Sequence, residues 1–313
     1  MPAIKLPYRL EPGEAPGSRF LAIARSLNDR IVEDIEGAEG DELESAYGAR
    51  KKLKRMRAVF RLMRHVDPDA YDAENQRCRD AGRALGPFRD RDVEGRALDE
   101  LVAHFAPALD EGLFDHLRER LAARRASEAL ADSGIRAALN FARAHAHLTR
   151  ATLSALNWQK IDAKPIVKSV VGDYKKARKL QAKVAAHRIH EDAHQMRKYI
   201  KYHWLHVRLL RPVWPGDYRH YQAQLRSIVD DLGALQDIEV LAGALAPINL
   251  SQSETRLLHA LIEARSKALL DSAIQGTAIA LDAKPKQLGF ALEDALSGFI
   301  AAVNEQEQGA IAS

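Results

Sequence analysis

The sequence predicts an all-α protein built from two related halves. Apolar residues recur at positions i, i+3, i+4 and i+7 over long windows, whereas the alternation typical of β-strands is scarce. Residues 46–98 align without a gap with residues 193–245, at a constant offset of 147 positions, and 17 of the 53 pairs are identical. Each half has enough helices to close a bundle around its own core. We therefore expect two four-helix bundles related by a pseudo-twofold axis, with an inserted helical hairpin.

Proline and glycine residues mark the expected ends of the helices, because both residues interrupt helical periodicity. In the first half the pattern predicts helices over 16–36, 41–65, 70–85 and 89–105. The inserted hairpin occupies 110–155. In the second half the pattern predicts helices over 164–183, 186–211, 217–232, 235–246, 252–280 and 287–305. The expected units are a first repeat over 14–108, a hairpin or linker over 109–157, and a second repeat over 158–310.

The composition argues against a secreted or membrane protein. Cys78 is the single cysteine of the 313 residues, so an internal disulfide is impossible, which fits a reducing compartment. No apolar run approaches the roughly 18 residues of a membrane span. The first residues also lack the apolar core of a signal peptide. We therefore expect a cytoplasmic protein.

Positive charge is concentrated in two segments, although the net charge is only +4. Residues 45–66 contain no acid and eight Lys or Arg, and residues 193–216 contain no acid and five. A solvated helix face would normally carry acids at i±4 spacing to offset such repulsion. Their absence indicates a localised site for a polyanion.

Helical geometry places these cations on one sector of each basic helix, beside the apolar sector that faces the core. The stripe of the first helix consists of Tyr47, Arg50, Lys51, Lys54, Arg57, Arg61 and Arg64. The stripe of the second consists of His187, His190, His194, Arg197, Lys198, Lys201, Arg208 and Arg211. His203 and His206 lie away from the second stripe. Arg offers bidentate donors to phosphate oxygens, Lys offers a point charge, and His adds a donor that strengthens as the pH falls.

These segments resemble the CHAD family, the conserved histidine α-helical domain proteins. Residues 46–64 and 189–210 are similar to the family's basic signature helix. The sequences LGPFRDRDV over 85–93 and LGALQDIEV over 232–240 resemble its LG-x-x-RD-x-x-V turn, and residues 172–178 resemble its Tyr-x-x-x-Arg helix. The resemblance covers residues 14–300. It implies two four-helix bundles around a basic cavity that binds inorganic polyphosphate, and it adds Tyr174, Lys175 and Arg178 to the expected site.

Some family members associate with polyphosphate granules, so the resemblance makes such an association an expectation here. One departure from the family pattern concerns its histidine, which is kept as His194 but replaced by Tyr47 in the first repeat. Tyrosine donates a hydrogen bond but cannot become positively charged. The departure predicts a first half-site that binds more weakly or responds less to pH. The repeats also differ where Arg57 corresponds to Trp204.

The segment from His190 to His194 matches H-E-x-x-H, a motif that on a helix can bind zinc, with Glu191 as a general base. A zinc protease is disfavoured because the surrounding cations repel Zn²⁺ and no third ligand follows at a known spacing. Adventitious binding of a metal such as nickel stays open. We expect no resident metal and no cofactor.

Three functions compete on the sequence alone. The first is non-catalytic binding of inorganic polyphosphate, which needs cationic stripes and no reading of bases. The second is nucleic-acid binding through the same stripes, the common default for a basic helical protein. The third and least favoured is an enzyme acting on phosphoanhydrides, because such chemistry normally needs Mg²⁺ held by carboxylates, which the stripes lack.

Overall fold

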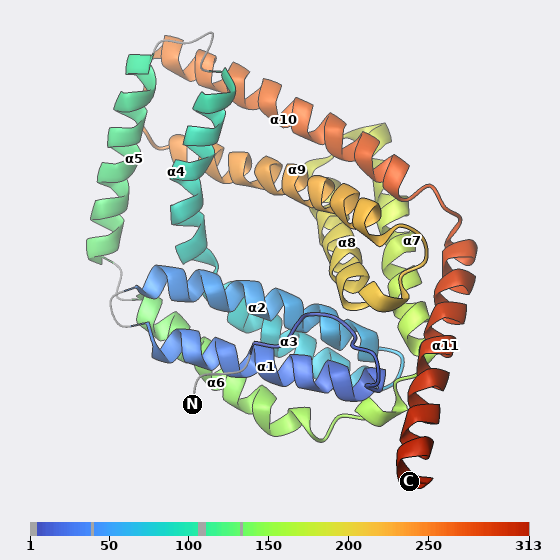
Figure 1. The fold of residues 1–313 in the computed structure, drawn as a ribbon. Helices are drawn as coiled ribbons and strands as arrows, with labels where there is room; N and C mark the ends of the chain where they lie inside the picture. The colour runs from blue at the N-terminus through green and yellow to red at the C-terminus, as the bar shows by residue number, and fades with distance from the viewer. Residues whose placement is uncertain (1–4, 39–40, 106–110, 132–133, 313) are drawn as a thin grey trace.

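The computed structural model describes residues 5–38, 41–105, 111–131 and 134–312. Within these ranges the chain forms eleven α-helices, two short 3-10 segments and no strand, which confirms the all-α fold class (Figure 1). None of the described helices combines the length and the apolar character that a membrane crossing requires.

The first bundle consists of α1 (Pro16–Glu36), α2 (Glu42–Met63), α3 (Pro68–Ala84) and α6 (Gly134–Leu153). Helix α1 packs on α2, α2 packs on α3, and α6 lies against both α1 and α3. Helices α2 and α3 begin where Asp41 and Asp67 accept hydrogen bonds from the backbone N–H groups three residues later, which satisfies donors that a helix start leaves unpaired. The apolar sector of α2 is buried in the main core, as its sequence predicts.

The two helices of the predicted hairpin form, but they pack on different partners. Helix α6 contributes to the main core, whereas α5 (Glu111–Ala131) packs on α4 (Gly86–Phe105). Residues Phe114, Leu117 and Leu121 of α5 belong to a second apolar cluster, which also includes residues of α4, α9 and α10. The sequence shows that each helix has an apolar face, but the face does not specify which partner covers it.

The second half consists of α7 (Ala163–His187), α8 (His190–Leu209), α9 (Tyr218–Leu245), α10 (Gln252–Ala280) and α11 (Pro285–Ala312). Helix α9 is continuous where the sequence pattern predicts two helices. The equivalent place in the first half is the break between α3 and α4, which carries Pro87. A proline ring clashes with the carbonyl four residues earlier, whereas Ala234 at the corresponding position does not. A single internal glycine, Gly233, costs only about 1 kcal/mol and does not end the helix.

The two halves meet where α2 contacts α7 and α8, and where α4 contacts α9. At the contact between α2 and α8, Ala58 is buried with Tyr202 and Leu205, and His206 Nε2 lies 2.9 Å from the Ala58 carbonyl oxygen. Residues 5–15, here called the N-terminal strap, run across this contact. The backbone N–H of Leu10 donates to the Leu209 carbonyl over 2.7 Å.

Candidate functional site

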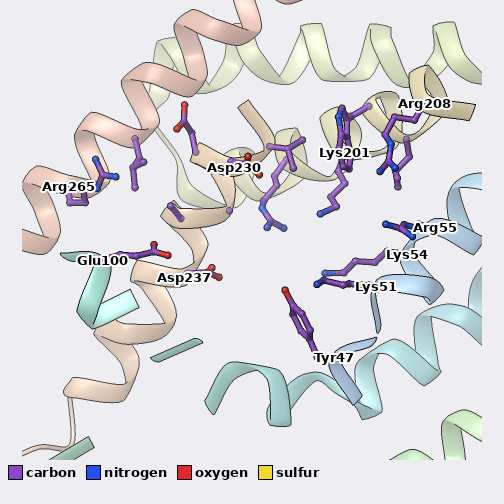
Figure 2. Close-up of a pocket in the computed structure, with 18 residues that line it drawn as sticks. Tyr47, Lys51, Lys54, Arg55, Glu100, Lys201, Arg208, Asp230, Asp237 and Arg265 are labelled. Atoms are coloured by element: carbon purple, nitrogen blue, oxygen red, sulfur yellow. The ribbon is translucent and has the colours of Figure 1, made fainter. Parts of the chain in front are cut away.

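An open cavity of about 600 Å³, here called cavity A, lies beside the contact between α2 and α8 (Figure 2). Both basic helices line it, together with α4, α9 and α10. Its cations are Lys51, Lys54, Arg55, Arg197, Lys201, Arg208 and Arg265. Cavity A therefore collects positive charge from segments about 150 residues apart in the chain.

Cavity A is divided into regions of opposite charge. Figure 2 shows Lys51, Lys54, Arg55, Lys201 and Arg208 on one side, which we call the basic end. The opposite side carries the carboxylates of Glu100, Asp230 and Asp237, which we call the acidic wall, and Arg265 lies on the same side. Anions are therefore attracted to the basic end and repelled by the acidic wall.

A second cavity of about 550 Å³, cavity B, is lined by α2, α3, the first residue of α4, and α8. Its cations are Arg50, Lys54, Arg57, Arg79, Arg83 and Lys198. No carboxylate is found among its lining residues in the described part of the chain. Lys54 lines both cavities, so the two basic surfaces meet at this side chain.

The two cavities use equivalent positions of the repeat. Arg50, Lys54 and Gly86 of cavity B correspond, at the offset of 147, to Arg197, Lys201 and Gly233 of cavity A. Each cavity also takes a lysine from the other basic helix: Lys198 of α8 lines cavity B, and Lys51 of α2 lines cavity A. Both basic helices therefore line both cavities.

The matched glycines lie against the matched arginines. A Cβ atom added to Gly86 would lie 3.2 Å from Arg50 Nη1, and one added to Gly233 would lie 3.2 Å from Arg197 Nη2. Arg50 Nη1 also donates a hydrogen bond to the Gly82 carbonyl. The Leu-Gly pairs shared by the repeats thus leave room for a guanidinium group at the edge of each cavity.

The structure places Arg61 and Arg64 at the interface between α2 and α7, away from both cavities. Arg61 Nε donates to Asp173 Oδ2 over 2.9 Å, and Arg61 Nη2 donates to the other carboxylate oxygen. Arg64 Nη1 donates to Asp173 Oδ1 over 3.1 Å. Burial opposes the charge of Arg61, but its hydrogen bonds to Asp173 outweigh burial and raise the pKa of Arg61. The predicted ligand contacts of these two arginines are therefore replaced by a buried ion-pair network.

Buried histidines lie behind this network. His203 and His206 have no exposed surface, which agrees with their predicted place away from the second stripe. His203 Nε2 is 2.8 Å from the Tyr221 hydroxyl. Burial lowers the pKa of His203 to about 3 and that of His206 to about 4. Both imidazoles are therefore neutral near pH 7; His206 joins the halves through Ala58, whereas His203 packs among aromatic residues of the second half.

Other expected site residues also lie outside the two cavities. The Tyr174 hydroxyl and Arg178 Nη1 both donate to the Ala283 carbonyl, over 2.7 and 3.0 Å, and so fix the loop before α11. The remaining members are exposed and line neither cavity; they are Lys175, His187 and Arg211.

The two histidines of the H-E-x-x-H segment share one carboxylate. His190 Nδ1 lies 2.6 Å from Glu239 Oε1, and His194 Nε2 lies 2.7 Å from Glu239 Oε2. Among the described residues, no group of three or more His, Cys, Asp or Glu side chains is arranged to hold a metal ion. Both histidines thus join α8 to α9 beside cavity A and do not line it.

Of the predicted site residues, nine line a cavity: Tyr47, Arg50, Lys51, Lys54, Arg57, Arg197, Lys198, Lys201 and Arg208. The sequence interpretation missed Arg55, Arg79, Arg83 and Arg265. A signal existed for Arg79, because Arg226 matches it in the repeat. Arg83 had no such signal, since Asp230 occupies the matching position.

Comparisons with known proteins identify the family of this architecture. The family model described as the CHAD domain matches residues 22–246. The crystal structure of the CHAD domain from the plant Ricinus communis has a similar fold, with a TM-score of 0.58 and 18% sequence identity. That similarity covers 91% of this chain and 96% of the plant chain. A search of curated proteins gave no match. The family match spans well over half of the chain, and the protein therefore belongs to the CHAD domain family.

Proposed function

We propose that the protein binds inorganic polyphosphate without transforming it, through cavity B and the basic end of cavity A. The observation that carries the proposal is cavity B, where six Lys or Arg side chains surround about 550 Å³ and no described lining residue is acidic. Like charges gathered around one cavity repel one another, and a bound anion reduces this repulsion. The shared Lys54 makes the basic surface continuous over more than one phosphate group.

The chemistry of the lining favours a repeating phosphate over a nucleic acid. Arg side chains offer planar pairs of donors to phosphate oxygens. The aromatic rings of cavity A are covered by cations: Lys51 Nζ lies 3.9 Å from the Tyr47 ring centroid, and Arg208 Cζ lies 4.9 Å from that of Trp204. Single-stranded nucleic acids are usually held by stacking on exposed rings. The covered rings support a ligand without bases.

A competition titration tests the proposal directly. Labelled long-chain polyphosphate is bound to the protein and displaced with unlabelled polyphosphate, RNA, DNA, ATP or orthophosphate, each with and without Mg²⁺. We expect long-chain polyphosphate to compete best, because several contacts along one chain act at high effective concentration. The affinity should also fall steeply with salt, since binding releases condensed counterions. Displacement at lower concentration by RNA or DNA would favour the nucleic-acid hypothesis instead.

The non-catalytic part of the proposal needs its own measurement. Long-chain polyphosphate is incubated with excess protein and Mg²⁺, and chain length and released orthophosphate are followed over hours. We expect neither to change beyond a protein-free control. Chain shortening that scales with protein concentration would establish the enzymatic alternative.

The cytoplasmic location and the association with polyphosphate granules stay predictions. A fluorescent fusion in cells that store polyphosphate would test both. We expect the fusion to lie in the cytoplasm and concentrate on granules, and a version with Arg79 and Arg83 replaced by Gln should do so less.

A further inference from the structure

The basic end of cavity A contains two arginines without a carboxylate partner. Arg55 and Arg208 both line the cavity, and neither forms an ion pair within the described part of the chain. Their Cζ atoms lie 5.9 and 5.8 Å from the ring centroid of Tyr8. Burial and then the charge of Arg208 lower the pKa of Arg55. The two guanidinium groups are thus close enough to repel each other.

The repeat explains why Arg208 is left without a carboxylate. Arg208 corresponds to Arg61, whose charge Asp173 neutralises. At the same offset of 147, the position of Asp173 corresponds to Ser26, which has no charge to offer. The same arginine is therefore a structural ion-pair member in one half and a cavity residue in the other.

The chain closes the cavity at this end. Ala58, Tyr202 and Leu205 are buried against one another, and Tyr8 and Trp204 pack on them. The Tyr8 hydroxyl donates to the Arg55 carbonyl over 3.1 Å, which attaches the N-terminal strap to α2. The strap precedes residues 22–246, the part that the family model matches. A linear ligand cannot continue past Arg55 and Arg208 through this packed region.

The acidic wall blocks the opposite direction. Glu100, Asp230 and Asp237 lie across the cavity from Arg55 and Lys54 (Figure 2). Placing phosphates against these carboxylates would bring like charges together in a confined space. Among the described lining residues, the acid-free surface that continues from the basic end is that of cavity B, which Lys54 also lines.

We infer that cavity A receives the end of a polyphosphate chain, with the terminal phosphate between Arg55 and Arg208 and the following phosphates passing Lys54 into cavity B. The inference rests on the proposed function. A terminal phosphate differs from an internal one in having a third non-bridging oxygen and a second ionisable proton. Compared with an internal phosphate, a terminal phosphate therefore offers more negative charge and one more acceptor oxygen to the paired N–H donors of two guanidinium groups.

The experiment compares two versions of one short linear polyphosphate of defined length. One has free ends, and the other has both terminal phosphates converted to phosphoramidates with a small amine, which removes an ionisable oxygen from each end. The binding of each is measured by calorimetry at constant ionic strength. We expect the blocked chain to bind about tenfold more weakly or worse, since a hydrogen bond to a charged group is lost.

Two double variants separate end recognition from total charge. Arg55→Gln with Arg208→Gln should remove most of the preference for free ends. Arg79→Gln with Arg83→Gln, the matched control in cavity B, should weaken both chains by similar factors and keep their ratio. Arg208→Lys keeps the positive charge but loses the paired N–H donors of the guanidinium group. It should therefore reduce the ratio of the affinities for the free and the blocked chain, and it provides a test even if the double variant in cavity A does not fold.

The outcomes distinguish this inference from the proposed function. Equal binding of free and blocked chains by the wild-type protein would overturn the inference and leave polyphosphate binding in place. A preference for free ends that survives both cavity A variants would also overturn it, because the end would then be bound elsewhere. Failure of both the free and the blocked chain to bind would overturn the proposed function itself.

Discussion

Cavity A and cavity B occupy equivalent positions of one sequence repeat, but their charges differ. The matched cations Arg50 and Arg197 are present in both. The neighbours differ, because Arg83 of cavity B corresponds to Asp230 of cavity A, and Arg57 corresponds to Trp204. The comparison teaches that a repeat can retain the cations of a site while the residues around them change the charge of each copy.

The prediction with the largest expected effect concerns the Asp173 ion-pair network, which holds together the two halves that line both cavities. Asp173→Ala would leave Arg61 and Arg64 without their carboxylate at the interface of the halves. We expect a loss of about 3–5 kcal/mol in the free energy of unfolding, because the remaining buried charges are uncompensated. Urea unfolding followed by circular dichroism measures it.

The control for this variant is Asp271→Ala, which removes exposed ion pairs to Arg188 and Lys267. Exposed pairs contribute about 0–1 kcal/mol, so this change should be small. Equal losses in the two variants would show that the Asp173 network does not support the contact between the halves.

The second prediction uses the buried histidines that lie behind the Asp173 network. The pKa values of His203 and His206 are lowered to about 3 and about 4 in the folded protein, whereas exposed histidines in the unfolded chain titrate near their ordinary value. Below that ordinary value the unfolded state binds more protons, so stability is present near pH 7 and decreases as the pH falls toward 4. Each histidine should contribute a slope of about 1.4 kcal/mol per pH unit in this window.

Unfolding free energies at several pH values between 4 and 7.5 check this slope. Because His220 is exposed, His220→Asn serves as the control and should keep the slope of the wild-type protein. His206→Asn should reduce the slope, although its stability near pH 7 will also be lower. A slope unchanged in His206→Asn would contradict the assignment.

A reciprocal exchange of charge tests the difference between the cavities themselves. Arg83→Asp makes cavity B resemble cavity A, and Asp230→Arg does the reverse. We expect Arg83→Asp to weaken polyphosphate binding by about tenfold or more, given the usual value of charged hydrogen bonds, and Asp230→Arg to strengthen it. Binding isotherms at several salt concentrations should show a shallower salt dependence for Arg83→Asp. If both variants shift affinity in the same direction, charge does not explain the difference between the cavities.

The smallest expected effect concerns the matched glycines. Gly86→Ala and Gly233→Ala should each push a guanidinium group by a few tenths of an ångström and weaken binding about two- to threefold. Gly233 lies in the interior of α9, whereas Gly86 is the first residue of α4, so only Gly233→Ala should also gain up to about 1 kcal/mol from helix propensity. Thermal unfolding and calorimetry on both variants measure the two effects. A stability gain from Gly86→Ala as large as that from Gly233→Ala would remove this contrast.

Much of the architecture and part of the site follow from the sequence. Helical periodicity gave the helices, and the shared cations identified α2 and α8 as the helices that line the cavities. Arg61 was misassigned because its partner Asp173 is 112 residues away, and periodicity carries no information on such a contact. The carboxylates of the acidic wall belong to α4 and α9, outside the basic segments, so an inventory of cations could not predict the polarity of cavity A.

The histidine prediction also needs revision in its physical basis. The sequence places His190 and His194 on the second stripe and predicts that anion affinity rises from pH 8 to pH 6 through them. In the structure both imidazoles contact Glu239 and neither lines a cavity. The rise with acidity, which the double variant His190→Ala with His194→Ala tests, stays a prediction.

Lys54 has one further consequence. A single ammonium group that lines two cavities carries one charge, and two separate ligands cannot both use it fully. Two small anions bound in cavities A and B should therefore show negative cooperativity, each reducing the affinity of the other. A single chain that passes Lys54 has no such competitor. The shared ammonium group thus lowers the affinity for two separate short phosphates but not the affinity for one continuous polymer. A preference for long chains can therefore arise without a site that contacts the whole length of the chain.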